Sequence, residues 1–206
     1  MSVLVRLKVN DDALKEVEAK LDGVKNGVEK VTMRAINRSL SSGKTALSKG
    51  IRKTYTVNAA TVNETISIRR ASVSNLEGSI VSSGKPLSAR HFSHSPEGQA
   101  TTGSERKRIR VTVKKGEGGK YKTGFLWDGG WGTDKYAIYI RSGGKIRPTK
   151  GYHAGKRYKV DKVKKVSGPS VPQMAGNEDV QERVQERVQE IFEKRLDHEV
   201  NRILKV

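Results

Sequence analysis

The sequence contains no cysteine, only five prolines and only 11 aromatic residues among its 206 positions. The absence of cysteine excludes disulfides, thiolate zinc sites and a thiol nucleophile, so the fold must rest on packing and hydrogen bonds. The few aromatic residues do not form the interleaved stacking platform that single-strand nucleic-acid binders use. The hydrophobic fraction of 34% is also low for a globular chain, and a thin core favours a protein that gains stability by association.

Long apolar runs are absent as well. No segment approaches the roughly 18 consecutive apolar residues that a membrane-spanning helix needs. Residues 1–10 alternate apolar and polar side chains and include Arg6 and Lys8, which interrupt the apolar region that a signal peptide requires. We therefore expect a protein made in the cytoplasm, with no membrane partner, whose first residues form a strand.

Acidic residues are scarce, since 22 aspartates and glutamates stand against 41 lysines and arginines, for a formal net charge of +19. The excess is concentrated in residues 84–167, which hold 21 basic and six acidic residues. Such a charge favours nucleic acid or another acidic surface as a neighbour.

The most concentrated basic run consists of Arg106, Lys107, Arg108 and Arg110. On a strand its three arginines share one face and its lysine points to the other. One interpretation is contact with DNA phosphates or with an acidic partner. The other is a solvated face whose charges prevent edge-to-edge aggregation, and the sequence leaves both open.

Apolar residues near the N-terminus recur at helical spacing and predict an amphipathic helix over about residues 11–53. The spacing fits a two-helix seam or a helix that lies on a sheet. Gly23 and Gly27 weaken this helix by about 1 kcal/mol each relative to alanine, so we expect a break or a close helix contact near them. The members of the apolar stripe that we assign to an interface are Val24, Val28 and Val31.

The period changes to two from residue 66 onward and predicts the strands of a half-buried antiparallel sheet in a basic region over about 66–167. The clearest strand segments are residues 66–69, 76–81, 109–113 and 136–141. The segment 168–176 follows, in which Pro169 and Pro172 bias their predecessors away from helix. We expect this segment to be an extended linker with a role in presenting an interface.

A final helix is predicted over residues 177–206. It begins with tandem Val-Gln-Glu-Arg tetrads, which keep successive valines on one broad face. The apolar residues of this face that we assign to an interface are Val184, Val188 and Phe192. The predicted class is therefore α+β, an antiparallel sheet with a long N-terminal amphipathic helix and a long C-terminal helix, with residues 1–167 as the main domain.

Catalytic and metal-binding patterns are weak. His91 and His94 have no carboxylate cluster beside them to complete a zinc or iron site. No phosphate-binding loop, calcium loop or Gly-x-Ser-x-Gly turn is present with the required spacing. We expect no enzymatic activity, no metal and no cofactor.

Several segments stand in a distinctive order along the chain. They are Met33-Arg-Ala-Ile-Asn-Arg-Ser-Leu40, Tyr55-x-Val57 with Ile66, Gly84-Lys-Pro-Leu87 with Phe92, Gly124-Phe125, Ile140-Arg-x-Gly-x-Lys-Ile-Arg-Pro148 and Gly168-Pro-Ser-Val-Pro-Gln-Met174. In this order they resemble the minor tail protein Z family of long-tailed phages and prophages. The last segment is the most specific, and the resemblance runs from about residue 30 to the end. A basic stretch at 149–167 departs from the family pattern.

This resemblance implies a structural virion protein at the head-proximal end of the tail, assembled in the host cytoplasm and needed for head–tail joining. The implied partners are other tail and neck proteins and further copies of the chain in a ring, for which a hexamer is one size, with genomic DNA as a further contact. The family is not known for catalytic residues, so none are carried over. The alternative from composition is a sequence-nonspecific nucleic-acid-binding protein, and the stoichiometry measured without DNA distinguishes the two.

Overall fold

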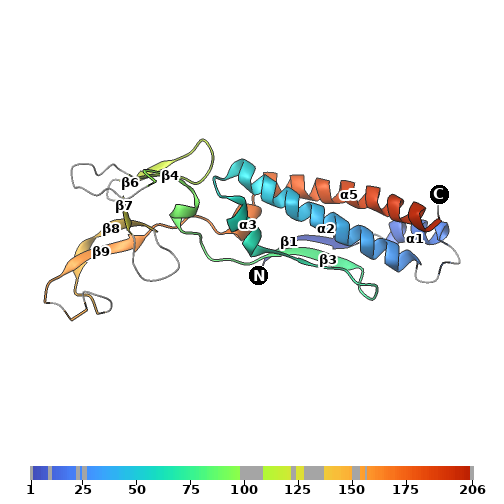
Figure 1. Cartoon of the computed structure of the whole chain (residues 1–206), viewed down its shortest axis with the longest axis horizontal. Helices are drawn as coiled ribbons and strands as arrows, with labels where there is room; N and C mark the ends of the chain where they lie inside the picture. Colours follow the sequence, from blue (N-terminus) through green and yellow to red (C-terminus); the bar gives the residue numbers. More distant parts are fainter. Residues whose placement is uncertain are drawn as a thin grey trace. The chain divides into compact units, whose positions relative to one another are not determined.

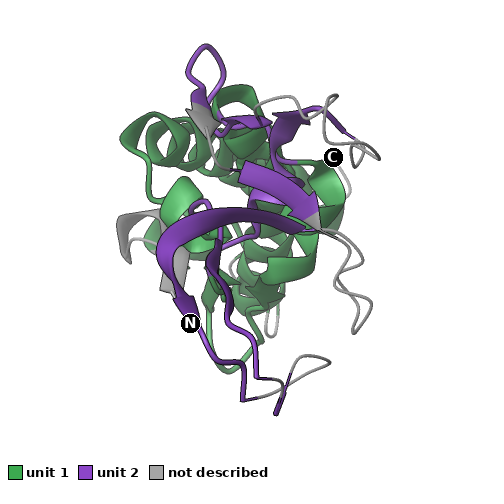
Figure 2. Cartoon of the chain, turned by 90° about the vertical axis from the view of Figure 1, so that its left-hand side faces the viewer, with its two compact units in different colours: residues 1–54, 58–85, 170–206 green, residues 55–57, 86–169 purple. Residues whose placement is uncertain are grey.

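The computed structural model describes residues 2–8, 11–21, 24, 27–97, 109–121, 124–127, 137–149, 154–155 and 157–204. The chain forms two compact units, which Figure 2 shows in different colours. Unit 1 comprises residues 1–54, 58–85 and 170–206, and unit 2 comprises residues 55–57 and 86–169. The helix expected at 177–206 thus belongs to unit 1, together with the N-terminal helices.

Unit 1 combines helices with one three-stranded antiparallel sheet. Its helices are α1 (Asp11–Lys20), α2 (Gly27–Thr54), α3 (Ala59–Thr65), α4 (Val171–Ala175) and α5 (Glu178–Leu204). Its sheet has the order β1-β3-β2, from β1 (Ser2–Lys8), β3 (Glu77–Ser82) and β2 (Ile66–Arg69). The α+β class is confirmed, and so are the strands predicted at 66–69 and 76–81.

The core of unit 1 lies where α2 packs between α5 and β3. Figure 1 shows α2 and α5 side by side along most of their length. The fully buried side chains of this core include Val31, Ile36, Leu40, Leu47 and Ile51 from α2, Val180 from α5 and Ile80 from β3. The 3.6-residue period of α2 and the four-residue tetrads of α5 thus place two apolar faces against each other.

The helix predicted over 11–53 is two helices, α1 and α2, with the break between Lys20 and Gly27. The glycines there weaken the helix at the place where the sequence indicated a break. Val28 and Val31 pack in a cluster with Val17, Leu21 and Val200. Val24 lies in the break and is 40% exposed in the single chain, so it stays a predicted interface residue, whereas Val31 is buried within unit 1.

The segment 168–176 is not extended throughout, because residues 171–175 form α4. Ser170 and Gln173 form a reciprocal capping box, in which each side chain bonds the other residue's backbone N–H. Pro172 sits in the first turn, where a missing N–H costs nothing. Val171 and Met174 are fully buried, so this motif packs into unit 1 instead of acting only as a spacer.

Unit 2 consists of two small antiparallel sheets in the part of the chain that is described. The first has the order β4-β5-β6, from β4 (Ser93–Ser95), β5 (Ile109–Thr112) and β6 (Gly119–Tyr121). The second has the order β7-β8-β9, from β7 (Gly124–Trp127), β8 (Ala137–Ile146) and β9 (Val160–Lys165), and a short 3-10 helix η1 covers Ala89–His91.

The strands predicted near 109–113 and 136–141 are confirmed as β5 and β8. All pairings are antiparallel, as expected, but the described strands form three sheets and not one. The physical reason is that β3 pairs with the N-terminal strand β1 on one side and with β2 on the other. This sheet contacts α2, so its strands are not available to the later strands. The basic stretch at 149–167 contributes β9, which pairs with β8.

A close contact between Gly168 and Phe92 explains two of the motif positions within unit 2. A Cβ atom at Gly168 would lie 2.5 Å from Cε2 of Phe92, so only glycine fits beside this buried ring. The backbone N–H of Gly168 donates to the carbonyl of Leu87 at 2.8 Å. These contacts join the beginning of the 86–169 segment of unit 2 to its end.

Candidate interaction surface on the two long helices

The motif at residues 33–40 builds the base of this surface. Ala35, Ile36 and Leu40 are fully buried. Asn37, on the neighbouring side of α2, makes two hydrogen bonds with the backbone of Ala71, since its Nδ2 donates to the carbonyl at 3.1 Å and its Oδ1 accepts from the N–H at 2.9 Å. The motif therefore fixes the loop after β2 to α2, and this gives Asn37 a structural role.

The same stretch of α2 holds a nearly buried carboxylate of α5. Oε2 of Glu199 lies 3.5 Å from Nη1 of Arg34 and 3.4 Å from Nη1 of Arg202, while the Glu199 side chain is only 9% exposed. A buried carboxylate needs such partners, because an unpaired charge away from water is costly. This trio ties the start of α2 to the end of α5.

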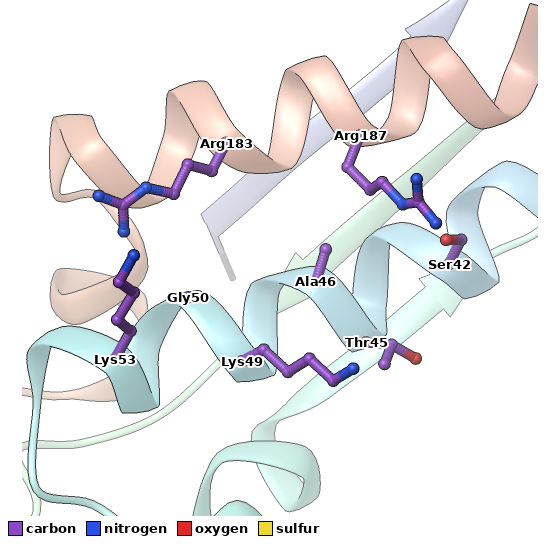
Figure 3. A pocket seen from close by; sticks show the side chains of 8 residues that line it. All are labelled: Ser42, Thr45, Ala46, Lys49, Gly50, Lys53, Arg183 and Arg187. Carbon is purple, nitrogen blue, oxygen red and sulfur yellow. The ribbon is translucent and has the colours of Figure 1, made fainter.

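A cationic groove lies further along the same two helices (Figure 3). It has a volume of about 480 Å³ and is lined by Ser42, Thr45, Ala46, Lys49, Gly50 and Lys53 of α2 and by Arg183 and Arg187 of α5. The floor consists of small residues, and the four long side chains around it are all basic. Among the described residues, no carboxylate lines this groove.

The charges of the cationic groove are poorly compensated within unit 1. Figure 3 shows the side chains of Lys53 and Arg183 pointing toward each other. Arg187 pairs with Glu190 at 2.6 Å, whereas Lys49, Lys53 and Arg183 have no ion pair among the described residues. Like charges four residues apart on a helix cost roughly 0.2–0.5 kcal/mol per pair. The groove therefore favours an acidic ligand.

The tetrads of α5 explain how this groove forms. In each tetrad the valine is buried against α2, and the arginine three residues later falls beside the seam. Gly50 lets α5 come close, because a Cβ there would stand only 3.3 Å from Cγ1 of Val180. The close seam brings the lysines of α2 and the arginines of α5 to the same groove.

Basic side chains continue along α2 on both sides of the cationic groove. A neighbouring groove of about 500 Å³ shares Lys49 and adds Lys44 and Arg52, and the Nζ of Lys44 donates to the carbonyl of Ile66 at 2.8 Å. A third hollow near the start of α2 contains Arg38 and Arg70. Helix α2 carries seven basic residues and one acidic residue, so its exposed side is cationic along its length.

An acidic row runs along the outer side of α5. Its members Glu178, Glu182 and Glu186 are exposed and lie one turn apart, without an ion pair among the described residues. The next carboxylate, Glu190, differs, because hydrogen bonds from Lys194 and then Arg187 hold its pKa below the ordinary value of 4.5. The three preceding glutamates form a second like-charged row and would gain from a basic partner.

The predicted interface residues of α5 lie inside unit 1. Val184, Val188 and Phe192 are buried at 5% exposure or less, and α2 and its neighbours already cover them. Any contact of α5 with a partner must therefore use its exposed polar side. Pro169 and Pro172 are half-buried, Pro169 as the last residue of unit 2 and Pro172 within α4.

The predicted basic run falls largely outside the described residues, since Arg106, Lys107 and Arg108 lie there. Arg110 is described, and it is exposed on β5 opposite Lys120. Sequence reasoning missed the cationic groove, although the arginine of each tetrad and the charge of residues 30–53 were available signals. Periodicity alone does not show that these two segments meet.

The described ranges contain neither a metal-binding cluster nor a membrane-spanning helix. No group of three or more His, Asp or Glu side chains there could hold a metal ion. No helix among these residues has the length and apolar character needed to cross a membrane.

Comparison with known proteins gives one match. A family model described as prophage minor tail protein Z covers residues 7–206, which is nearly the whole chain. No curated protein and no solved structure matches significantly.

Proposed function

Because the chain belongs to the prophage minor tail protein Z family, we propose that it completes the head-proximal end of a phage tail and makes the tail competent to join the head. Membership of the family makes the chain a phage minor tail protein, a structural component of the virion with other tail proteins as partners. The position at the head-proximal end and the joining step are the proposed parts.

The match over residues 7–206 is the observation that carries this proposal. The described residues agree with a structural role, because their motif positions serve packing and backbone contacts. Asn37 fixes Ala71, Gly168 makes room for Phe92, and Ser170 caps α4. The proposal assigns no catalytic step to any of them.

Assembly of several copies is a further part of the proposal. The low hydrophobic fraction leaves a modest core, and association with identical subunits supplies additional buried surface. A tail end with rotational symmetry suits a closed ring, and a hexamer is the size to test first. The basic excess would then face the end of the genome or an acidic neighbour.

A gene deletion tests this function. In a phage that lacks the gene for this chain, we expect free filled heads and free tails instead of joined particles, and a plasmid copy of the gene should restore joining. Electron microscopy of the lysate counts the three species. Labelled protein should mark the head-proximal end of complemented tails. Deletion particles that join and infect normally would refute the proposal.

A further inference from the structure

We propose that the cationic groove of one copy binds the acidic row of a second copy, so that neighbouring subunits associate head to tail. The groove is the one between Lys49, Lys53, Arg183 and Arg187, and the row is Glu178, Glu182 and Glu186. This inference rests on the proposed function, in which several copies act together at the tail end. It assigns the surfaces that hold them together.

The two surfaces match in spacing. The lysines of the groove stand four residues apart on α2, and its arginines stand four residues apart on α5. The glutamates of the row also repeat every four residues. In an α-helix four residues advance about 6 Å, so a helix lying along the groove presents successive carboxylates at the spacing of the cations.

The two surfaces also match in shape and charge. The groove floor contains Ala46 and Gly50, whose small size lets a helix approach between the long basic side chains. The charges of both surfaces lack partners of opposite sign within one subunit. Among the described residues, only Arg187 of the four groove cations pairs with a carboxylate, and the three glutamates of the row have no ion pair. Docking therefore brings together opposite charges that the isolated chain leaves apart.

Within one copy, the three glutamates of the row form no ion pair with the cations of the groove among the described residues. Glu182 and Arg183 are adjacent in sequence, so their side chains diverge by roughly 100° around α5. Each copy thus offers one groove and one row on different sides of the same helix. Such a heterologous contact forms a ring when its rotation closes and a filament when it does not.

Nucleic acid is the competing occupant, because a basic groove also suits phosphates. The acidic row favours the second copy. Glu178 stands in the first turn and stabilises the helix start, whereas the described contacts of unit 1 give Glu182 and Glu186 no role in folding. A polyanion in the groove would leave all three uncompensated. A second copy satisfies the groove and the row in one contact.

A charge-swap experiment on the full chain tests this contact. The first variant combines Lys49→Glu with Lys53→Glu, and the second combines Glu182→Lys with Glu186→Lys. All four residues are exposed, and thermal unfolding followed by circular dichroism checks that each variant keeps its fold. Sedimentation velocity at low salt measures association of each variant and of their equimolar mixture.

Each variant alone places two reversed charges against residues of the same sign at the contact, so we expect association to require at least tenfold higher concentration than for the unaltered chain. The mixture should restore association, because each altered surface meets an opposite one on the other variant. If a variant fails to fold, Lys→Gln and Glu→Gln replacements at the same positions should weaken association of each variant alone. Their mixture should recover dimers only, through the one contact that joins an unaltered groove to an unaltered row.

Three results would overturn the inference: a monomeric unaltered chain at every concentration, variants that associate as the unaltered chain does, or a mixture that stays dissociated. Normal association with loss of DNA binding in the first variant would assign the groove to nucleic acid instead. These results leave head–tail joining untouched, and the deletion experiment tests that separately.

Discussion

Gly43 of α2 lies directly against the side chain of Val188 of α5. A Cβ atom at Gly43 would overlap Cγ2 of Val188 and would stand 3.0 Å from Cδ1 of Ile80 on β3. Gly43 therefore lies where α2 contacts both α5 and the sheet of unit 1. Glycine is required here by close approach in an ordinary helix, and not by an unusual backbone angle.

Replacing Gly43 tests this contact. Alanine would favour the helix by about 1 kcal/mol in isolation, but overpacking typically costs about 1–3 kcal/mol, so we expect Gly43→Ala to lower the free energy of unfolding. Urea titration measures the change. Adding Val188→Ala should recover part of the loss, and strictly additive losses would show that the two residues do not compete for space.

Asn37→Ala removes both hydrogen bonds to Ala71 and leaves two buried backbone groups without their partner. We expect a loss of about 1–3 kcal/mol in the free energy of unfolding. Asn63 is the matched control, because it is exposed on α3 and its side chain makes no such contact. Equal effects of Asn37→Ala and Asn63→Ala would contradict the assigned role.

Val184→Asp should prevent unit 1 from folding, because it buries a carboxylate at a fully enclosed site between α5 and α2. The neighbouring change Gln185→Asp places the same group on the exposed side and should alter the free energy of unfolding by no more than about 0.5 kcal/mol. Circular dichroism compares the two. A folded Val184→Asp protein would mean that α5 is not part of this core.

Acid should remove the contribution of Glu190 to stability. Lys194 and Arg187 lower its pKa in the folded state, so the carboxylate stabilises the fold above its ordinary pKa of 4.5. This contribution falls as the pH drops below 4.5 through the lower folded value, where protonation breaks both bonds. The melting-temperature difference between the unaltered chain and Glu190→Gln should therefore shrink in that window. A difference that stays constant across it would contradict the assignment.

The basic run gives a prediction about DNA. Replacing Arg106, Lys107, Arg108 and Arg110 with glutamine should weaken sequence-independent DNA binding and flatten its salt dependence, because fewer phosphates are neutralised. In the phage, tails that assemble but fail to deliver DNA would indicate a channel lining. Tails that fail to form would indicate a protein partner, and unchanged infectivity would mean a solvated face.

Local patterns allowed much of the fold to be predicted. The α+β class, β2, β5 and α5 each follow from a hydrophobic period within one segment, and a period is a property of neighbouring residues. The partner of a buried face, in contrast, is a segment far away in the sequence or another protein, and a local period does not identify it. Val184 and Val188 were correctly placed on one apolar face, but the same pattern fits a partner protein and α2 equally well.

The cationic groove shows the same limit. Lys49 and Arg183 are far apart in the sequence, and only the antiparallel packing of α2 and α5 brings them to one groove. The charge count identified residues 84–167 instead, because it finds basic residues that are close in the sequence. It does not find basic residues that come together only in the folded chain. Glycines indicated the break in which Val24 lies. The capping box of α4 was hidden by Pro169 before the helix and Pro172 in its first turn, because a proline biases its predecessor away from helix.

The pairing of α2 with α5 also has a consequence for how the protein is made. Arg34 and Glu199, which join these helices, are 165 positions apart. During translation, α2 therefore leaves the ribosome long before its covering helix has been synthesised, and the apolar side chains of its inner face meet water or a chaperone in the meantime. We expect ribosome-bound chains that stop before α5 to recruit chaperones strongly, and the full-length chain to release them once the valines of its tetrads arrive.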